Sequence, residues 1–267
     1  MTASAPLLEL DQVTISYRRR RDRVDAVRGV SLVIQPGEAY GLVGESGCGK
    51  STLAMAVMRH LPKNGHLSGG QVLFEGRDLL TLPDRAFRPL RRNIQMVFQE
   101  PYVALNPRWT VARLIAEPLA LDPEMASPAA CRARVLKMLD LVHLPARLAG
   151  VFPHELTAGE QKRVGMARAL ATRPDFVVFD EPTTALDIRV RAQIIDLVRE
   201  LQREMQLATL FITHDLNSVR SLAHNVAVMR HGKIVEIGET ERIFASPQHD
   251  YTRMLLGAEL PIERYAA

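Results

Sequence analysis

A glycine-rich stretch in the first fifth of the chain carries residue types that bind phosphate. It fits the pattern G-x-x-x-x-G-K-[ST] with Gly44, Glu45, Ser46, Gly47, Cys48, Gly49, Lys50, Ser51 and Thr52. Glycines let a backbone close around phosphate oxygens where a Cβ would intrude. In such a loop, Lys50 reaches the β- and γ-phosphates and the Ser51 hydroxyl ligates Mg²⁺. The pattern therefore predicts a binding site for nucleotide phosphates.

The elements that must position this loop are readable on both sides of it. The apolar run 39–43 predicts a buried strand, and residues 53–58 predict the first turns of a helix. A helix that starts here offers unpaired N–H groups and the positive end of its dipole to an anion. A chance glycine-rich turn is the alternative, and the flanking strand and helix disfavour it.

Polar residues follow two later predicted strands. Asp180 and Glu181 end the apolar run that begins at Asp175, and His214 follows the run 209–213. Behind a phosphate loop, Asp180 would hold Mg²⁺ and Glu181 would polarise an attacking water. His214 is expected at the carboxyl end of a parallel strand, where α/β sheets bind ligands. Surface acids and a structural histidine are the alternatives.

The remaining segments predict a mixture of strands and helices. Further strands are expected at 8–17, 30–34, 71–74 and 93–98, with a hairpin over 226–237 and a short helical tail. The basic run 18–23 is expected to be a solvated hairpin loop. Tyr17, before the phosphate loop, either stacks on a purine or simply packs. Gln99 ends the strand at 93–98.

A block without strands follows Gln99. Residues 100–109 are rich in proline and turn formers, which predicts an irregular surface segment that carries the single tryptophan, Trp109. From Thr110 to about Leu156 the pattern is helical, with a helix start at Ser127–Pro128. We interpret its apolar stripe as a packed helix face: Cys131, Val135, Met138, Leu139 and Val142.

Composition limits the class of protein. The 267 residues are 47% hydrophobic and 24% charged, with a net charge of +4, which is ordinary for a globular protein. No apolar run is long enough to cross a bilayer, and the first residues lack the features of a signal peptide. Cys48 and Cys131 are far apart, which disfavours a zinc site or disulfide framework. We expect a cytosolic chain that binds no nucleic acid.

With these motifs, the stretch Leu156–Val164 completes a resemblance to the ATP-binding-cassette (ABC) ATPases. The resemblance runs from about Leu7 to Met254 and includes the phosphate loop, Gln99, Asp180–Glu181, Ala185–Asp187 and His214. It implies one α/β nucleotide-binding domain with a P-loop NTPase core, in which a mainly parallel sheet accompanies an antiparallel β subdomain. Residues 1–99 and 165–267 would form this core. An inserted α-helical subdomain would span about residues 100–164.

The resemblance also implies roles for individual residues. Tyr17 would stack on adenine, Glu181 would be the catalytic base, and His214 would contact the γ-phosphate. The Mg²⁺ of MgATP would be held by Ser51, Gln99 and Asp180. Gln99 would also sense the transport partner, and Asp187 would lie in a loop that crosses to a second ATPase subunit. Two such subunits would sandwich two ATP molecules.

Two stretches resemble the dipeptide, oligopeptide and nickel importer branch. They are Val97–Pro101 with Leu105–Arg108, and the segment Ser246–Thr252. The resemblance implies two integral-membrane permease subunits, an external solute-binding protein, and a peripheral position on the cytoplasmic face of the cell membrane. Peptide, nickel and metal-chelate cargo all remain open. The alternatives are a soluble ABC-type ATPase, or a GTPase or small-molecule kinase, although no Asn-Lys-x-Asp guanine motif is present.

The signature stretch departs from the family pattern L-S-G-G-Q. It reads Leu156, Thr157, Ala158, Gly159 and Glu160. Thr157-x-x-Glu160 matches a capping box, in which threonine and glutamate satisfy N–H groups at the start of a helix. A carboxylate there would repel a phosphate. We hypothesise that this signature completes a weak site, which favours a heterodimer over a homodimer; the alternative is that the box only stabilises the helix.

Overall fold

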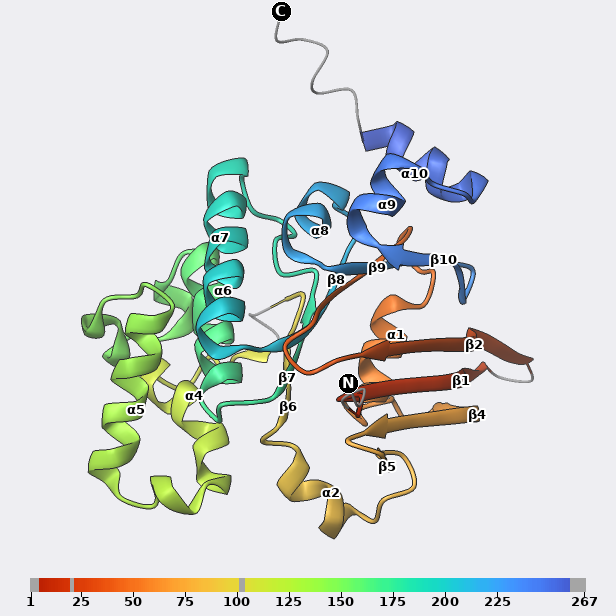
Figure 1. The fold of residues 1–267 in the computed structure, drawn as a ribbon. Helices are drawn as coiled ribbons and strands as arrows, with labels where there is room; N and C mark the ends of the chain where they lie inside the picture. Colours follow the sequence, from red (N-terminus) through yellow and green to blue (C-terminus); the bar gives the residue numbers. More distant parts are fainter. Residues whose placement is uncertain (1–4, 20–21, 101–103, 260–267) are drawn as a thin grey trace, which may run out of the picture. The chain divides into compact units, whose positions relative to one another are not determined.

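The computed structural model describes residues 5–19, 22–100 and 104–259 (Figure 1). The chain forms two compact units, one of residues 1–82 and 208–267 and the other of residues 83–207. The first unit carries the phosphate loop, and the second carries Asp180 and Glu181. Within the described ranges, none of the helices has the length and apolar character needed to span a membrane.

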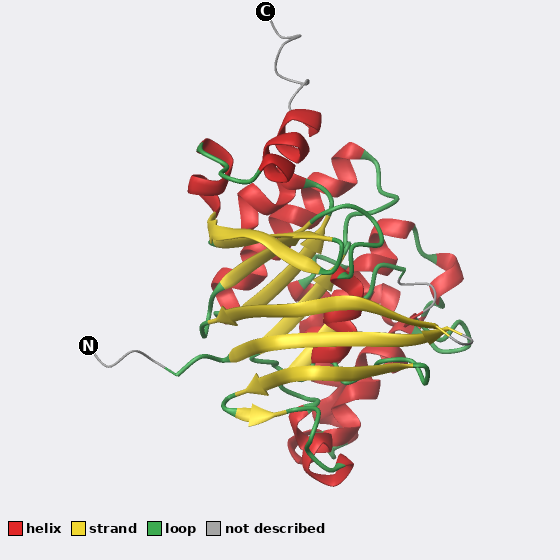
Figure 2. Cartoon of the chain, turned by 90° about the vertical axis from the view of Figure 1, so that its right-hand side faces the viewer, coloured by secondary structure: helices red, strands yellow, loops and turns green. Residues whose placement is uncertain are grey.

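The first unit contains an antiparallel sheet with the strand order β2–β1–β4–β5, whose strands lie side by side in Figure 2. The strands are β1 (Leu8–Arg19), β2 (Asp22–Ile34), β4 (Gly65–Phe74) and β5 (Arg77–Asp78). The expected strands at 8–17 and 30–34 are confirmed, but the expected hairpin loop at 18–23 is too long. Arg18 pairs with Arg23, and Arg19 with Asp22. Arg18, Asp22 and Arg23 are exposed on this antiparallel ladder, so the run of charges was interpreted as a loop although it continues the strands.

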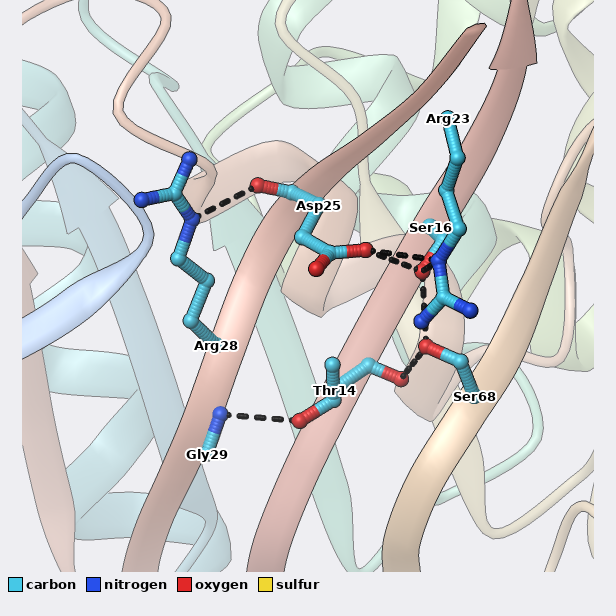
Figure 3. A network of polar contacts seen from close by, with 7 residues as sticks. All are labelled: Thr14, Ser16, Arg23, Asp25, Arg28, Gly29 and Ser68. Atoms are coloured by element: carbon cyan, nitrogen blue, oxygen red, sulfur yellow. Dashed lines mark hydrogen bonds and ion pairs between the residues drawn. The ribbon is translucent and has the colours of Figure 1, made fainter.

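A network of polar side chains links three strands of this sheet (Figure 3). Ser16 on β1 is fully buried, and its hydroxyl donates to Asp25 on β2 at 2.5 Å. The Ser16 and Ser68 hydroxyls lie 2.7 Å apart, and Arg23 Nε donates to both Ser16 and Asp25 at 3.0 Å. The Ser16 hydroxyl and Arg23 lower the pKa of Asp25. The buried hydroxyl is therefore satisfied across the strands.

The same unit contains a parallel set of strands. Strand β3 (Ala39–Val43) lies between β8 (Ala208–Thr213) and β9 (Asn225–Arg230), parallel to both. Strand β10 (Lys233–Glu239) pairs antiparallel with β9, which confirms the expected hairpin. The helices are α1 (Lys50–Val57), α8 (Leu216–Leu222), α9 (Thr240–Ala245) and α10 (Asp250–Glu259). Strands β3 and β8 are buried along their whole length, as expected for strands covered on both faces.

The second unit is mostly helical around one parallel strand pair. Strands β6 (Ile94–Val97) and β7 (Phe176–Asp180) pair in parallel, with Val97 opposite Phe179. The helices are α2 (Asp84–Leu90), α4 (Val111–Ala116), α5 (Pro128–Leu141), α6 (Ala158–Leu170) and α7 (Ile188–Met205). Short 3₁₀ segments cover Glu117–Leu121, Pro123–Met125, Ala146–Gly150 and Pro153–Glu155.

The expected helical block is present from Val111 onward, and α5 begins at Pro128 after Ser127 as expected. Of its apolar stripe, Cys131 is half-buried and the other members are buried, as expected for a packed face. The expected irregular segment at 100–109 includes residues 101–103, which lie outside the described residues. The limits of the expected core and helical subdomain stay a prediction.

Candidate nucleotide-binding site

The phosphate loop joins the carboxyl end of β3 to the start of α1. Its glycines are packed against neighbouring backbone, because a Cβ added at Gly44 would lie 2.1 Å from the Met229 carbonyl oxygen. A Cβ at Gly49 would lie 2.4 Å from the Ala26 oxygen. Both glycines have positive φ, 151° and 114°. The loop therefore needs glycine for its approach to β9 and β2, as well as for its backbone angles.

Lys50 is the first residue of α1, and its side chain turns back into the loop. It is 5% exposed, and Nζ donates to the carbonyl oxygens of Gly44 at 2.7 Å and Glu45 at 3.0 Å. An ammonium group beside a helix N-terminus presents positive charge and N–H donors at one place. The loop therefore has the chemistry for an anion. The contacts made by Ser46, Ser51 and Thr52 with phosphate or metal stay predictions.

The Cys48 thiol is buried, with 7% exposure, and Lys50 Nζ lies 3.8 Å from its Sγ. Burial is the largest influence and raises the pKa of Cys48, although Lys50 acts in the opposite direction. A thiol beside an ammonium group is either a reactive thiolate or an ordinary buried cysteine. The direction of the pKa shift favours an ordinary buried cysteine, and the reactivity of the thiol stays a prediction.

Tyr17 and His214 belong to the same unit as the loop. The Tyr17 hydroxyl donates to Thr52 Oγ1 at 3.3 Å, so this half-buried side chain reaches the helix that follows the loop. His214 is exposed and directly follows Thr213, the last residue of β8. Because β8 is parallel to β3, His214 and the loop leave the sheet at the same edge. Stacking on adenine and contact with a γ-phosphate stay predictions.

Glu181 and Gln99 meet in the second unit because of strand register. Each lies two residues beyond the paired residues Phe179 and Val97. Gln99 Nε2 donates to Glu181 Oε2 at 3.1 Å, and the Thr184 hydroxyl donates to the same oxygen at 2.8 Å. Glu181 has φ 43°, a conformation that is rare outside glycine. The carboxylate is thus held by two neutral donors in a strained turn, the kind of arrangement found at functional sites.

Asp180, the last residue of β7, is 5% exposed. Its carboxylate and the Gln99 amide oxygen, both in the second unit, are hard oxygen donors of the type that Mg²⁺ prefers. The donor chemistry therefore fits the predicted metal. Among the described residues, no group of three or more histidines, cysteines and acids is arranged to hold a metal ion without other donors.

Lys162 is a member of this cluster that sequence reasoning missed. It lies on α6 with 3% exposure, and its ammonium donates to the backbone oxygen of Gln99. Burial lowers the pKa of Lys162, while Glu181, Asp180 and Glu100 act in the opposite direction. The lysine therefore ties the signature helix to the residue that contacts Glu181. The sequence held one signal for this role, because the helical pattern places Lys162 on the buried face of α6, where a lysine is unusual.

The capping box expected in the signature is confirmed. Thr157 precedes α6, and its hydroxyl oxygen accepts from the Glu160 N–H at 3.3 Å. Glu160 Oε2 accepts from the Thr157 N–H and hydroxyl, each at 2.8 Å. Ala158 is exposed, and a Cβ at Gly159 would lie 2.9 Å from Val190 Cγ1 on α7. Glu160 is therefore folded over the start of α6.

Asp187 caps α7, since its Oδ1 accepts from the Val190 N–H at 3.0 Å. The next residue, Ile188, is 83% exposed, an unusual state for a large apolar side chain. Contact of this loop with a second subunit stays a prediction.

Comparison with known proteins places the site in a family. The ABC transporter family model matches residues 27–184. The peptidoglycan transport ATP-binding protein YejF of Agrobacterium fabrum is 45% identical over 97% of this chain, which covers 48% of that protein. The dipeptide transport ATP-binding protein DppF of Lactococcus lactis is 39% identical, with 97% of this chain and 82% of the relative covered. The chain thus spans about half the length of the YejF relatives.

Solved structures agree with the family match. The ATP-binding cassette MJ0796, in a dimeric post-hydrolysis state bound to ADP and Pi, has a TM-score of 0.79 at 29% identity, over 87% of this chain and 98% of the other. CbiO1 from Clostridium perfringens, part of an ABC transporter complex, has a TM-score of 0.78 at 26% identity, with 97% of each chain covered. These likenesses confirm the expected α/β P-loop NTPase fold. The chain belongs to the ABC transporter family.

Proposed function

We propose that the chain is the ATP-hydrolysing subunit of an ABC importer for a peptide-type solute, with Mg²⁺ as the metal of the nucleotide. The observation that carries the proposal is the Glu181 carboxylate, held by Gln99 and Thr184 at the end of β7. A positioned carboxylate can accept a proton from an attacking water. The phosphate loop and Lys50 supply the donors for the nucleotide phosphates. Relatives named as dipeptide and oligopeptide transport proteins support the peptide class.

The test is ATP hydrolysis by the chain expressed together with its candidate membrane subunits. We expect Mg²⁺-dependent turnover, which Lys50→Met should abolish, because that change removes the only ammonium group bonded to the loop carbonyls in the described structure. Co-purification with two polytopic subunits would support an importer on the cytoplasmic face of the membrane, served by an external solute-binding protein. Hydrolysis by a chain that associates with no membrane subunit would favour the soluble ABC-type ATPase.

The proposed docking surface for the permease lies in the second unit. Trp109 is half-buried, with the Arg113 guanidinium 4.3 Å from its ring centroid. Next to it, a groove of about 920 Å³ is lined by α4 and α5 residues that include Ala112, Arg113, Val135 and Leu136. Aromatic and arginine side chains are common energetic centres of interfaces. Tyr102, part of the irregular surface segment expected from sequence, lies outside the described residues.

The proposal includes a second, different ATPase subunit. In the family, the start of the signature helix faces the γ-phosphate bound by the opposite subunit. Here Glu160 occupies the Thr157 N–H and hydroxyl, and its negative charge would repel a phosphate at short range. The site completed by this signature would therefore be weak, and a partner with a regular signature would complete the strong one.

The double change Ala158→Gly with Glu160→Gln tests this asymmetry in the complete complex. We expect ATP turnover to rise several-fold, because the carboxylate is neutralised and the methyl group is removed. The matched control is Glu155→Gln, which neutralises a carboxylate that caps the neighbouring 3₁₀ segment through the Phe152 N–H. Unchanged turnover, or a stable and fully active homodimer of the unmodified chain, would contradict the proposal.

A further inference from the structure

Helix α10 contacts the phosphate loop. Tyr251 on α10 is 2% exposed, and its hydroxyl accepts a hydrogen bond from the Glu45 backbone N–H at 3.1 Å. The two residues are 206 positions apart in the chain. Nothing in the proposed function uses Tyr251, so this contact calls for an explanation of its own.

The contact involves one particular peptide group. The Glu45 N–H belongs to the peptide unit whose oxygen is that of Gly44, and this oxygen accepts from Lys50 Nζ at 2.7 Å. In a trans peptide the N–H and the C=O point in opposite directions. Tyr251 and Lys50 therefore hold the two ends of the same peptide plane. A rotation of that plane would move the oxygen that anchors the lysine.

The segment that carries Tyr251 is itself fixed to the β9–β10 hairpin. Glu236 on β10 accepts from the backbone N–H groups of Gln248 at 2.7 Å and His249 at 3.0 Å. Burial alone would raise the pKa of Glu236, but the hydrogen bonds that it accepts lower this pKa overall. The Arg230 guanidinium lies 4.7 Å from the centroid of the Tyr251 ring. Arg230 thus contacts the phenol ring, while Glu236 fixes the backbone just before α10.

The same hairpin supports the loop at a second point. The Gly232 N–H donates to the Cys48 oxygen at 2.9 Å, and the Met229 oxygen limits the space at Gly44. The loop is therefore supported by the hairpin directly and by Tyr251 of α10. These contacts leave the Lys50 ammonium directed at the loop carbonyls.

We infer that Tyr251 is a positioning residue of the nucleotide site, which orients the Gly44–Glu45 peptide group so that Lys50 is held in place for the nucleotide phosphates. The inference rests on the proposed nucleotide-binding function. It assigns the Ser246–Thr252 segment to the support of the phosphate loop.

The test compares Tyr251→Phe with Tyr40→Phe in the full chain, by calorimetric titration with ADP, ATP and AMP in the presence of Mg²⁺. Tyr40 is a second buried tyrosine of the same unit, 4% exposed, outside the loop. Loss of this partly buried hydrogen bond to the Glu45 N–H should weaken ADP and ATP binding roughly three- to tenfold. AMP binding should change little, because AMP lacks the β- and γ-phosphates that Lys50 reaches. Tyr40→Phe should bind all three nucleotides as the unmodified chain does.

A double-mutant cycle separates positioning from simple folding support. If Tyr251 acts through Lys50, Tyr251→Phe should have little further effect on ADP affinity in the Lys50→Met background. Equal loss of affinity in both backgrounds would overturn the inference. So would unchanged ADP affinity in Tyr251→Phe, or an equal loss for AMP and ADP. If the unmodified chain binds neither ADP nor ATP, the proposed function itself fails, which is a distinct result.

Discussion

The phosphate loop of the first unit and the carboxylate cluster of the second are held in place by different kinds of contact. The loop is built from backbone, with glycines packed on carbonyl oxygens and a lysine bonded to loop carbonyls. The cluster is built from side chains, with Glu181 receiving bonds from Gln99 and Thr184 and with Lys162 bonded to Gln99.

This difference predicts where each region is vulnerable. A backbone site is damaged by added atoms, because a new Cβ cannot rotate away from a neighbouring carbonyl. A side-chain site is damaged by changes that preserve shape and remove charge or a proton acceptor. Changes that add atoms to the loop and changes that remove charge from the cluster should therefore have different effects.

The largest effect is expected for Glu181→Gln in the complete complex. The change keeps the size of the side chain but removes the carboxylate that would accept the proton of water. ATP hydrolysis should fall by about 10²–10⁴-fold, the usual contribution of a positioned acid or base. ATP binding should be retained and a closed dimer should accumulate, as measured by nucleotide titration and gel filtration. Near-normal turnover would exclude Glu181 as the base.

A smaller but still large effect is expected for Gly44→Ala. Its Cβ would lie 2.1 Å from the Met229 oxygen, and φ of 151° adds strain of about 1–3 kcal/mol. Nucleotide affinity should fall more than tenfold as the loop shifts. Gly76→Ala is the control, because Gly76 also has positive φ, 74°, but no atom beyond its chain neighbours lies within 4 Å of its added Cβ. If Gly76→Ala lowers nucleotide affinity as much as Gly44→Ala, the clash with the Met229 oxygen is not the cause of the loss.

The sequence predicted most of the local structure of both regions. The strand before the phosphate loop, the strand before Asp180 and the capping box of Thr157 and Glu160 depend on neighbouring residues, so short patterns were sufficient. The contacts of Tyr251 with Glu45 and of Lys162 with Gln99 join residues 206 and 63 positions apart. Such pairs are set by tertiary packing and have no local pattern. The early start of β2 was missed for a related reason, since its charged residues pair without entering the core.

An intermediate effect is expected for Lys162→Met in the second unit. The change leaves the Gln99 backbone oxygen without its charged donor, which should shift the side chain that contacts Glu181. We expect kcat to fall about tenfold, consistent with the loss of a hydrogen bond from a charged group. The KM for ATP should change less than kcat, because the bonds of Lys50 to the loop carbonyls are not altered.

Lys162→Gln is the matched variant, because its amide can still donate to the Gln99 oxygen. It should recover most of the lost turnover. If Lys162 acted through its charge alone, Lys162→Gln would be as slow as Lys162→Met. If Lys162→Met and Lys162→Gln are equally slow, the hydrogen bond to Gln99 does not position the cluster. If both fold poorly by thermal melting, Lys162 is a structural residue of α6.

The smallest effect is expected for the alkylation rate of the Cys48 thiol, which reports how far the loop favours a thiolate. Lys50 and the helix N-terminus favour a thiolate at Cys48, but burial is the larger influence and raises its pKa. Because the thiolate is the reactive form, iodoacetamide should modify Cys48 more slowly than the half-buried Cys131 near neutral pH. The Cys48 rate should rise at a higher pH than the rate of an ordinary thiol does.

The chain with Cys131→Ser isolates the Cys48 rate, and MgADP should lower this rate further by covering the loop. A Cys48 that reacts faster than Cys131 at pH 7 would show that the cation outweighs burial, so the loop would stabilise an anion of its own before any phosphate binds.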